Sequence, residues 1–305
     1  MKVLATGFRF PEGPVVMRDG SVCVVEIAAG RISRVSQDGD VSVLAETGGG
    51  PNGMAAGPDG ALYVCNNGGF IVRDVEGETR VVHGELPDDY VTGSIQRVDP
   101  ITGQVSVLYT HCGDTPLSAP NDLVFDAYGG FYFTDFGKIR KRSRDMGCVY
   151  YALPDGSHIQ EVMHPLANPN GIGLSPDQQT LYVAETETSR LWAYDIVERG
   201  KVKKNGFPSP NGGRLVCGLP GYQRFDSLAV QADGSICIGT LIAGCVTVIS
   251  PDGEVLRQVP MPDRYPTNIC FGGADMKTAY VTLSLTGKLV QLDWDSPGLP
   301  LHGIA

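Results

Sequence analysis

Six polar residues hold the same position in six similar stretches of this chain, and their types are those that bind hard metal ions. The stretches are FPEGPVVMRDGSVCVVEI (10–27), GPNGMAAGPDGALYVCNN (50–67), APNDLVFDAYGGFYFTDF (119–136), NPNGIGLSPDQQTLYVAET (168–186), RFDSLAVQADGSICIGTL (224–241) and YPTNICFGGADMKTAYVTLS (265–284). Their third positions are Glu12, Asn52, Asn121, Asn170, Asp226 and Thr267. Two carboxylates and three amides supply only oxygen ligands, which suit a cation such as Ca²⁺ better than a thiolate-binding or imidazole-binding metal.

The alternative explanation is turn chemistry, because Pro-Asn-Gly and Pro-Asn-Asp are common turn sequences in which Asn bonds its own backbone. That explanation accounts for a single Asn. It does not account for Glu12 or Asp226 in the same column, since Glu rarely forms turns. The column therefore predicts a ring of oxygen ligands.

Each stretch reads as strand, turn and strand, with Asp-Gly turns at residues 19–20, 59–60 and 233–234. Further strand pairs lie between the stretches, so each unit contains four strands. Six such units predict an all-β fold, a six-bladed β-propeller with four-stranded antiparallel blades that occupies residues 1–305 as a single domain. The last unit lacks a clear fourth strand, and we expect the N-terminal MKVLATGF to supply it and close the ring. First strands line the channel of a propeller, so the column should converge on its axis.

A second column follows from strand direction, because the second strand of each unit ends on the face where the first began. Its residues are Glu26, Asn66, Asp135, Glu185 and Thr240. We expect them to surround the ring, with Asp135 and Glu26 as candidate general bases and Asn66 and Glu185 as candidates for substrate binding. Each could instead be a solvated strand end.

Two connections depart from the repeat. FGKIRKRSRDMG (136–147) is the densest basic run, and Arg140 and Arg142 could attract an anionic substrate, although a solvated loop is an equal alternative. The 69 residues that separate Asn52 from Asn121 exceed every other spacing, and the excess near 82–93 predicts a lid or binding loop.

Composition limits the function classes. The chain has 305 residues and a net charge of −10, which argues against nucleic acid or a membrane as partner. No long apolar run is present, so we expect a soluble, cytoplasmic protein. The eight cysteines include no CxxC pair and lie mainly in apolar runs, as expected for buried free thiols. The oligomeric state is open.

Together, FPEGP, PNDLVFDAYGGFYFTD, NPNGIGLSPDQQTLYVAET and DSLAVQADGSICIG resemble the senescence-marker-protein/gluconolactonase (regucalcin-like) family, related to diisopropyl-fluorophosphatase. The resemblance covers the whole chain. It implies metal ligands at Glu12, Asn170 and Asp226, with Asn121 on the metal or the substrate and Asp135 near the substrate. It also implies hydrolysis of lactones or phosphoesters with Ca²⁺, Zn²⁺, Mn²⁺ or Fe²⁺. Sugar-lactone-hydrolysing animal members carry Arg where this chain has Ala119, which argues against gluconolactone itself.

We therefore expect a metal-dependent lactonase. One divalent cation, Ca²⁺ first and Zn²⁺, Mn²⁺, Mg²⁺ or Fe²⁺ as alternatives, would lie on Glu12, Asn121, Asn170 and Asp226. Asn52 and Thr267 would contact a small, anionic substrate, and Asp226 or Asp135 would activate water. The alternatives are a phosphoester or fluorophosphate hydrolase, a non-hydrolytic enzyme that acts on a lactone or enol ether, and a non-catalytic calcium-binding propeller.

Overall fold

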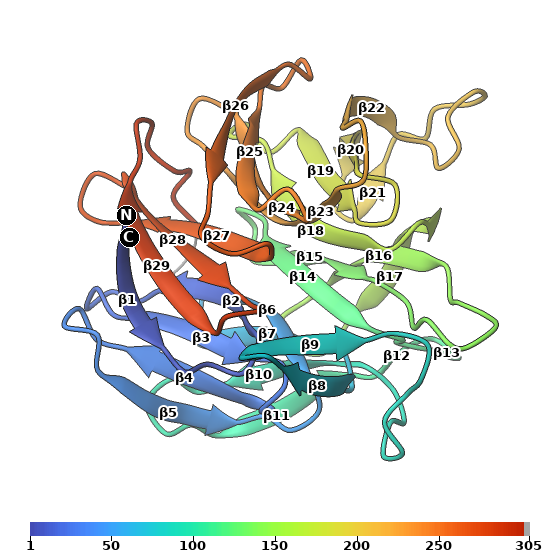
Figure 1. Ribbon diagram of the computed structural model, residues 1–305. Coiled ribbons are helices and arrows are strands. Elements are labelled where there is room, and N and C mark those ends of the chain that lie inside the picture. The colour runs from blue at the N-terminus through green and yellow to red at the C-terminus, as the bar shows by residue number, and fades with distance from the viewer. Residues whose placement is uncertain (302–305) are drawn as a thin grey trace.

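The computed structural model describes residues 1–301, in which six antiparallel sheets of four or five strands are arranged around a central axis (Figure 1). This confirms the predicted six-bladed β-propeller. The innermost strands are β2 (Pro11–Val16), β6 (Pro51–Ala56), β14 (Pro120–Phe125), β18 (Pro169–Leu174), β23 (Arg224–Val230) and β27 (Pro266–Gly272). Each contacts the innermost strands of both neighbouring sheets, which closes the ring. Because blades pack face to face, β2, β14 and β18 are buried along their whole length.

We number the blades 1 to 6 in the order of these innermost strands. The remaining strands of each blade follow outward in chain order, except that β1 is the outer strand of blade 6. The second strands are β3 (Val22–Glu26), β7 (Leu62–Asn66), β15 (Phe131–Asp135), β19 (Thr180–Glu185), β24 (Ile236–Leu241) and β28 (Thr278–Leu283). The third strands are β4 (Arg31–Val35), β10 (Ser94–Val98), β16 (Gly147–Ala152), β20 (Arg190–Glu198), β25 (Cys245–Ile249) and β29 (Lys288–Asp293). The outer strands are β5 (Val41–Glu46), β11 (Val105–Tyr109), β17 (Ile159–Leu166), β22 (Arg214–Gly218), β26 (Val255–Pro260) and β1 (Lys2–Thr6).

The N-terminal strand completes the last blade. Strand β1 pairs antiparallel with β29, as the missing fourth strand required, and the two strands lie side by side in Figure 1. Leu4 and Ala5 of β1 are buried in a core with Tyr280 and Leu289 of the same blade. β1 thereby becomes the outer strand of this blade in place of β29.

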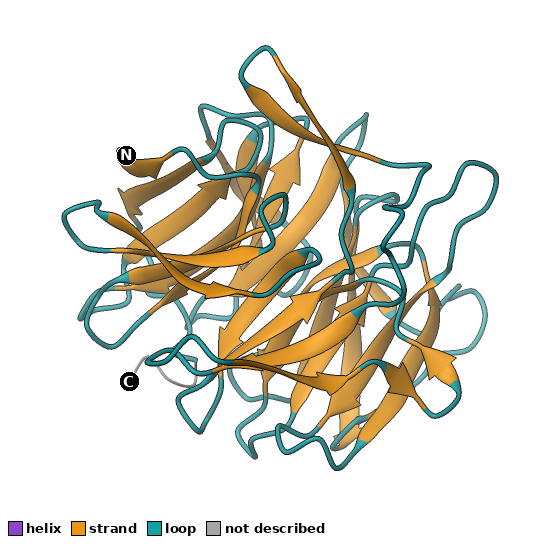
Figure 2. Cartoon of the chain, turned by 90° about the horizontal axis from the view of Figure 1, so that it is seen from below, coloured by secondary structure: helices purple, strands orange, loops and turns teal. Residues whose placement is uncertain are grey.

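Short elements outside the blade pattern complete the fold. They are β8 (Ile71–Val75), β9 (Glu78–Val82), β12 (His111–Cys112), β13 (Thr115–Pro116) and β21 (Lys201–Val202). Strands and loops account for the described chain in Figure 2, and residues 1–301 include no helix able to cross a membrane. The glycines of the predicted Asp-Gly turns, Gly20, Gly60 and Gly234, have φ of 79°, 78° and 89°, the left-handed region those turns require. All eight cysteines are free, and six of them are buried.

Candidate metal and substrate site

The six residues of the predicted ring line one pocket at the end of the central channel. They are Glu12, Asn52, Asn121, Asn170, Asp226 and Thr267. Each comes from the start of a different innermost strand, and each is at most 8% exposed. The fold therefore gathers in one place side chains that are up to 255 residues apart in the sequence, counting from Glu12 to Thr267.

A bulge in every innermost strand directs these side chains. The register of each blade shifts at the ring residue, as between Glu12 and Val15 in β2 and between Pro169 and Ile172 in β18. The shift recurs in the other four blades. A bulge leaves one residue unpaired and turns a side chain away from the sheet, here toward the axis.

The residue after each ring position lies where neighbouring strands come closest. In three blades it is glycine: a Cβ on Gly13 would lie 2.5 Å from the Asn52 carbonyl oxygen, and one on Gly171 would lie 2.6 Å from the Leu228 nitrogen. In the other three blades it is a buried polar residue, Asp122, Ser227 or Asn268. The sequence analysis missed this second layer, although the alignment of the repeats contains it as the next column.

The second layer holds the ring residues in place. Asn268 Nδ2 donates to Glu12 Oε2 at 2.8 Å, and the Gly13 amide donates to the same oxygen at 2.5 Å. Ser227 Oγ donates to Asn170 Oδ1 at 3.3 Å. Asn170 Nδ2 in turn donates to Thr186 Oγ1 at 3.1 Å, and the two bonds together fix the orientation of the amide.

Two buried oxygens of the ring have no partner within residues 1–301: Oε1 of Glu12 and Oδ1 of Asn121. An unpaired buried acceptor is costly unless something outside the chain satisfies it. Thr267 differs, because its hydroxyl is within 2.9 Å of Thr282 Oγ1 and 2.5 Å of Ser284 Oγ. Glu12 and Asn121 therefore present free acceptors to the pocket, whereas Thr267 is engaged by its own blade.

Three carboxyl groups at the axis, those of Glu12, Asp122 and Asp226, have raised pKa values. Burial raises the pKa of Glu12 to about 7. Burial, followed by the charge of Glu12, raises the pKa of Asp122 to about 8 and also raises that of Asp226. A divalent cation would offset this concentration of negative charge, and the ring's free oxygens fit one. Within residues 1–301 no metal-binding group of three His, Cys, Asp or Glu occurs, so a cation here would depend on the ring amides.

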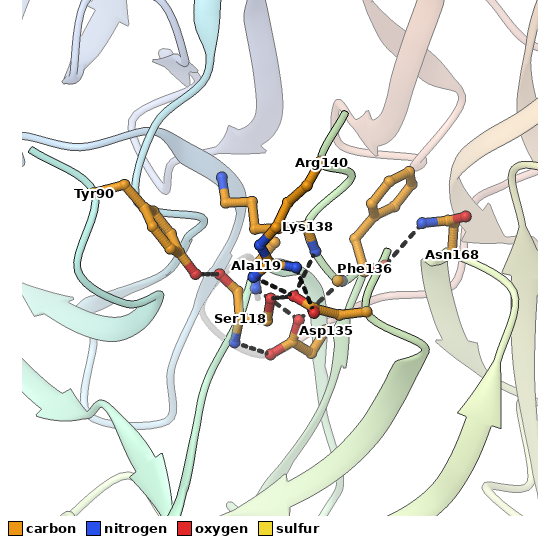
Figure 3. Close-up of polar contacts among 10 residues, drawn as sticks. Tyr90, Ser118, Ala119, Asp135, Phe136, Lys138, Arg140 and Asn168 are labelled. Atoms are coloured by element: carbon orange, nitrogen blue, oxygen red, sulfur yellow. Dashed lines mark hydrogen bonds and ion pairs between the residues drawn. The ribbon is translucent and has the colours of Figure 1, made fainter. Parts of the chain in front are cut away.

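The second column has a different placement from the one expected. None of Glu26, Asn66, Asp135, Glu185 and Thr240 lines the pocket. Asp135 accepts from the amides of Ser118, Ala119 and Gly137 at 2.7 to 3.0 Å (Figure 3). These bonds fasten the end of β15 to the segment that enters β14. We therefore do not retain Asp135 as a candidate base.

The same fastening recurs in other blades. Glu26 accepts from the Arg9 amide at 2.8 Å and from Arg31 Nε at 2.8 Å. Asn66 accepts from the Gly50 amide, and Glu185 accepts from the Ala167 amide, both at 2.9 Å. Thr240 bonds Thr247 within its own blade. Glu26, Asn66 and Glu185 thus hold the segment that enters their blade, and their roles in catalysis and binding stay predictions from strand direction alone.

The basic loop also lies outside the pocket. Arg140 forms an ion pair with Asp145 at 2.6 Å within the loop itself, and Arg142 is exposed. Neither lines the pocket. The pocket instead contains arginines that the sequence analysis did not select, Arg80, Arg224 and Arg264, together with His83.

The long spacing between the second and third repeats forms a hairpin that covers part of the pocket. The extra residues lie between β7 and β10, so the insertion starts before the predicted 82–93 and includes the pair β8 and β9. The Thr79 amide donates to the Leu285 carbonyl at 2.9 Å, and Asp74 pairs with Arg9 at 3.0 Å. The hairpin of blade 2 is thus anchored to the next two blades round the ring, to blade 1 through Arg9 and to blade 6 through Leu285.

Lys138, from the basic loop, is buried beneath this insertion. Its Nζ donates to the Gly69 carbonyl at 2.6 Å and lies 4.1 Å from the Phe70 ring centroid and 4.8 Å from that of Tyr90. Phe70 lines the pocket. Figure 3 shows the labelled Lys138 among the polar contacts of Asp135 and Ala119. The residue therefore joins the insertion to blade 3.

Burial of Lys138 makes stability depend on pH in a defined direction. Burial lowers the pKa of Lys138 from 10.5 to about 7. Between these values the unfolded chain keeps the proton and the folded chain releases it, so the free energy of unfolding rises with pH. The free energy of unfolding of the wild type, relative to that of Lys138→Met, should rise by up to about 1.4 kcal/mol per pH unit from pH 7 upward. Urea denaturation at pH 6 to 9 measures this, with the exposed Lys141→Met as control. If the difference in unfolding free energy between the wild type and Lys138→Met stayed constant with pH, the lowered pKa of Lys138 would be contradicted.

A six-bladed propeller with a ring of polar residues at its axis defines the class of this protein. The SMP-30/Gluconolactonase/LRE-like region family matches residues 10–285, so the chain belongs to that family. It is 25% identical to gluconolactonase of Zymomonas mobilis over 93% of this chain and 79% of that protein. It is 30% identical to lactonase drp35 of Staphylococcus saprophyticus over 83% of this chain and 70% of that protein. The fold is shared with the calcium-binding protein regucalcin from Agrobacterium tumefaciens (TM-score 0.76, 18% identity, 98% of this chain and 96% of that one).

Proposed function

We propose that this protein is a divalent-metal-dependent lactonase whose active site is the axial ring. The observation that carries the proposal is the pair of unsatisfied buried oxygens, Glu12 Oε1 and Asn121 Oδ1, in the same pocket as the Asp226 carboxyl. Membership of a family whose named members include a gluconolactonase and a lactonase supports the reaction class. The calcium-binding regucalcin supports a metal in this fold.

The ligands proposed are Glu12, Asn121, Asn170 and Asp226, with Ca²⁺ as the first candidate because all four offer oxygen. A bound dication supplies Lewis-acid polarisation of the lactone carbonyl. Asn170 keeps its side-chain oxygen oriented through its bond to Thr186, and Asn268 orients Glu12. These contacts fix the ligands before substrate arrives.

Asp226 is the proposed base. Its carboxyl group lies in the pocket with the other ring residues, where it could accept a proton from a water molecule beside the cation. In the proposed reaction a carboxylate oxygen of Asp226 takes a proton from the attacking water while the water oxygen bonds to the lactone carbonyl carbon. The ring C–O bond then breaks, and the proton passes to the departing alkoxide. Asn52, which also lines the pocket, is proposed to contact the substrate.

The test is hydrolysis of sugar, aliphatic and aromatic lactones, followed with a pH indicator, by chelated protein and by protein supplied with Ca²⁺, Mn²⁺ or Zn²⁺. We expect turnover of at least one lactone that depends on the added cation. A phosphotriester in the same panel tests the phosphoesterase alternative. Tight metal binding without turnover of any lactone would contradict the proposal and favour a phosphoesterase or a non-catalytic calcium-binding propeller.

A further inference from the structure

The pocket of this acidic protein is lined by three arginines. The chain carries a net charge of −10, yet Arg80 from β9, Arg224 from β23 and Arg264 from the segment before β27 all lie in the pocket lining. They come from three separate parts of the chain. Their convergence is therefore a property of the fold and not of one basic run.

The carboxylates that pair with these arginines do not line the pocket. Glu78 lies 2.7 Å from Arg80 Nη2 and 3.1 Å from Arg264 Nη2, and Glu187 lies 3.1 Å from Arg224 Nη2. Glu78 thus pairs with both Arg80 and Arg264, whereas Arg224 has Glu187 to itself. Both hydrogen bonds from Arg264 to Glu78 use Nη2, so its Nη1 has no partner among the described residues.

Arg224 is the arginine nearest the axial ring along the chain. It lies on the same strand as Asp226, two positions earlier, and its side chain is 24% exposed, the least of the three. Its charge acts across the pocket: burial and then the charge of Arg224 lower the pKa of His83. Arg224 also opposes the rise that burial causes in the pKa of Tyr265. A group bound beside Arg224 would therefore lie between the insertion, the ring and blade 6.

Part of the pocket wall is apolar. Phe10, Ile27 and Leu285 form a buried cluster against which Phe70, Val81 and Tyr265 pack, and all six line the pocket. A polyhydroxylated sugar ring would lose hydrogen bonds to water against such a surface. An apolar body would gain from the same contact.

We propose that the preferred substrate is a lactone with an apolar body and one carboxylate, the carboxylate binding at Arg224. This inference rests on the proposed lactonase activity. Charge-assisted hydrogen bonds from a guanidinium are the usual means of recognising a carboxylate.

The experiment compares matched ligands that differ in one charge. The reactive pair is 5-oxotetrahydrofuran-2-carboxylate and the corresponding carboxamide, for which kcat/KM is measured in calcium-loaded protein. The inert pair is cyclopentanecarboxylate and cyclopentanecarboxamide, for which Kd is measured by calorimetry. Wild type is compared with Arg224→Gln and with Arg34→Gln, a control that removes an equally ion-paired arginine from β4, outside the pocket.

We expect the wild type and Arg34→Gln to prefer each carboxylate about tenfold or more, and Arg224→Gln to lose that preference mainly through KM and Kd. Equal handling of acid and amide, or a preference that survives in Arg224→Gln, would overturn the inference while turnover keeps the lactonase proposal intact. If no lactone were turned over but the wild type still bound the carboxylate more tightly than the amide, and Arg224→Gln did not, the lactonase proposal would be refuted. The carboxylate site at Arg224 would be supported.

Discussion

The Asp226→Asn variant is expected to lose lactone hydrolysis by a factor on the order of 10³. Asparagine keeps the shape of the side chain but removes both the negative charge proposed to hold the cation and the oxygen proposed to accept a proton. The variant should also lose the rise in Tm that the cation gives the wild type. The measurements are kcat/KM on the best lactone and thermal unfolding with and without Ca²⁺.

The stability of the metal-free proteins distinguishes loss of a metal ligand from general damage to the fold. Burial and the charge of Glu12 raise the pKa of Asp226, so its ionised form is unfavourable in the cation-free fold. The metal-free variant should therefore be at least as stable as the metal-free wild type. Asp252→Asn, in an exposed turn of the same blade, is the control and should behave as wild type. An active Asp226→Asn enzyme with an unchanged metal-dependent Tm would exclude the proposed ligand set.

The Gly53→Val variant is expected to lose about 3 kcal/mol of unfolding free energy and with it the metal site. A Cβ at this position would lie 2.5 Å from the carbonyl oxygen of Asn121 and 2.5 Å from the Cα of Asp122. Both are backbone atoms of β14, so relief of the clash must separate blades 2 and 3 at the ring.

Urea denaturation and calcium calorimetry measure the two effects. Gly206→Val is the matched control, because Gly206 is exposed and a Cβ there meets no atom within 4 Å. If Gly53→Val were as stable as the wild type, the innermost strands would tolerate separation. The close approach of Gly53 to β14 would then not be required to build the ring.

Repetition explains why the fold and the ring could be predicted from the sequence. Six similar units place equivalent residues around one axis. The third position of the repeat therefore identified all six ring residues of the pocket, from Glu12 to Thr267. The expected pairing of the N-terminal strand with the last blade followed from the same count of strands. The order of residues in the repeat also contained Ser227 and Asn268, which a reading of the next column would have found.

Other features of the pocket depend on contacts that no repeat encodes. Arg80 and His83 come from an insertion without an equivalent in other blades, and Arg264 pairs there with Glu78, 186 residues away. Asp135 failed as a candidate for another reason. Strand direction placed it at the correct face, but three backbone amides occupy its oxygens.

The most direct test of the central claim is a titration of chelated protein with a divalent cation while lactone hydrolysis is recorded. The account requires that activity rise with added Ca²⁺, or with one of its alternatives, and reach a plateau at one equivalent per chain, with no rise in Asp226→Asn. Full lactone hydrolysis by the metal-free protein, or a plateau that Asp226→Asn shares, would contradict a reaction driven by a cation on the axial ring.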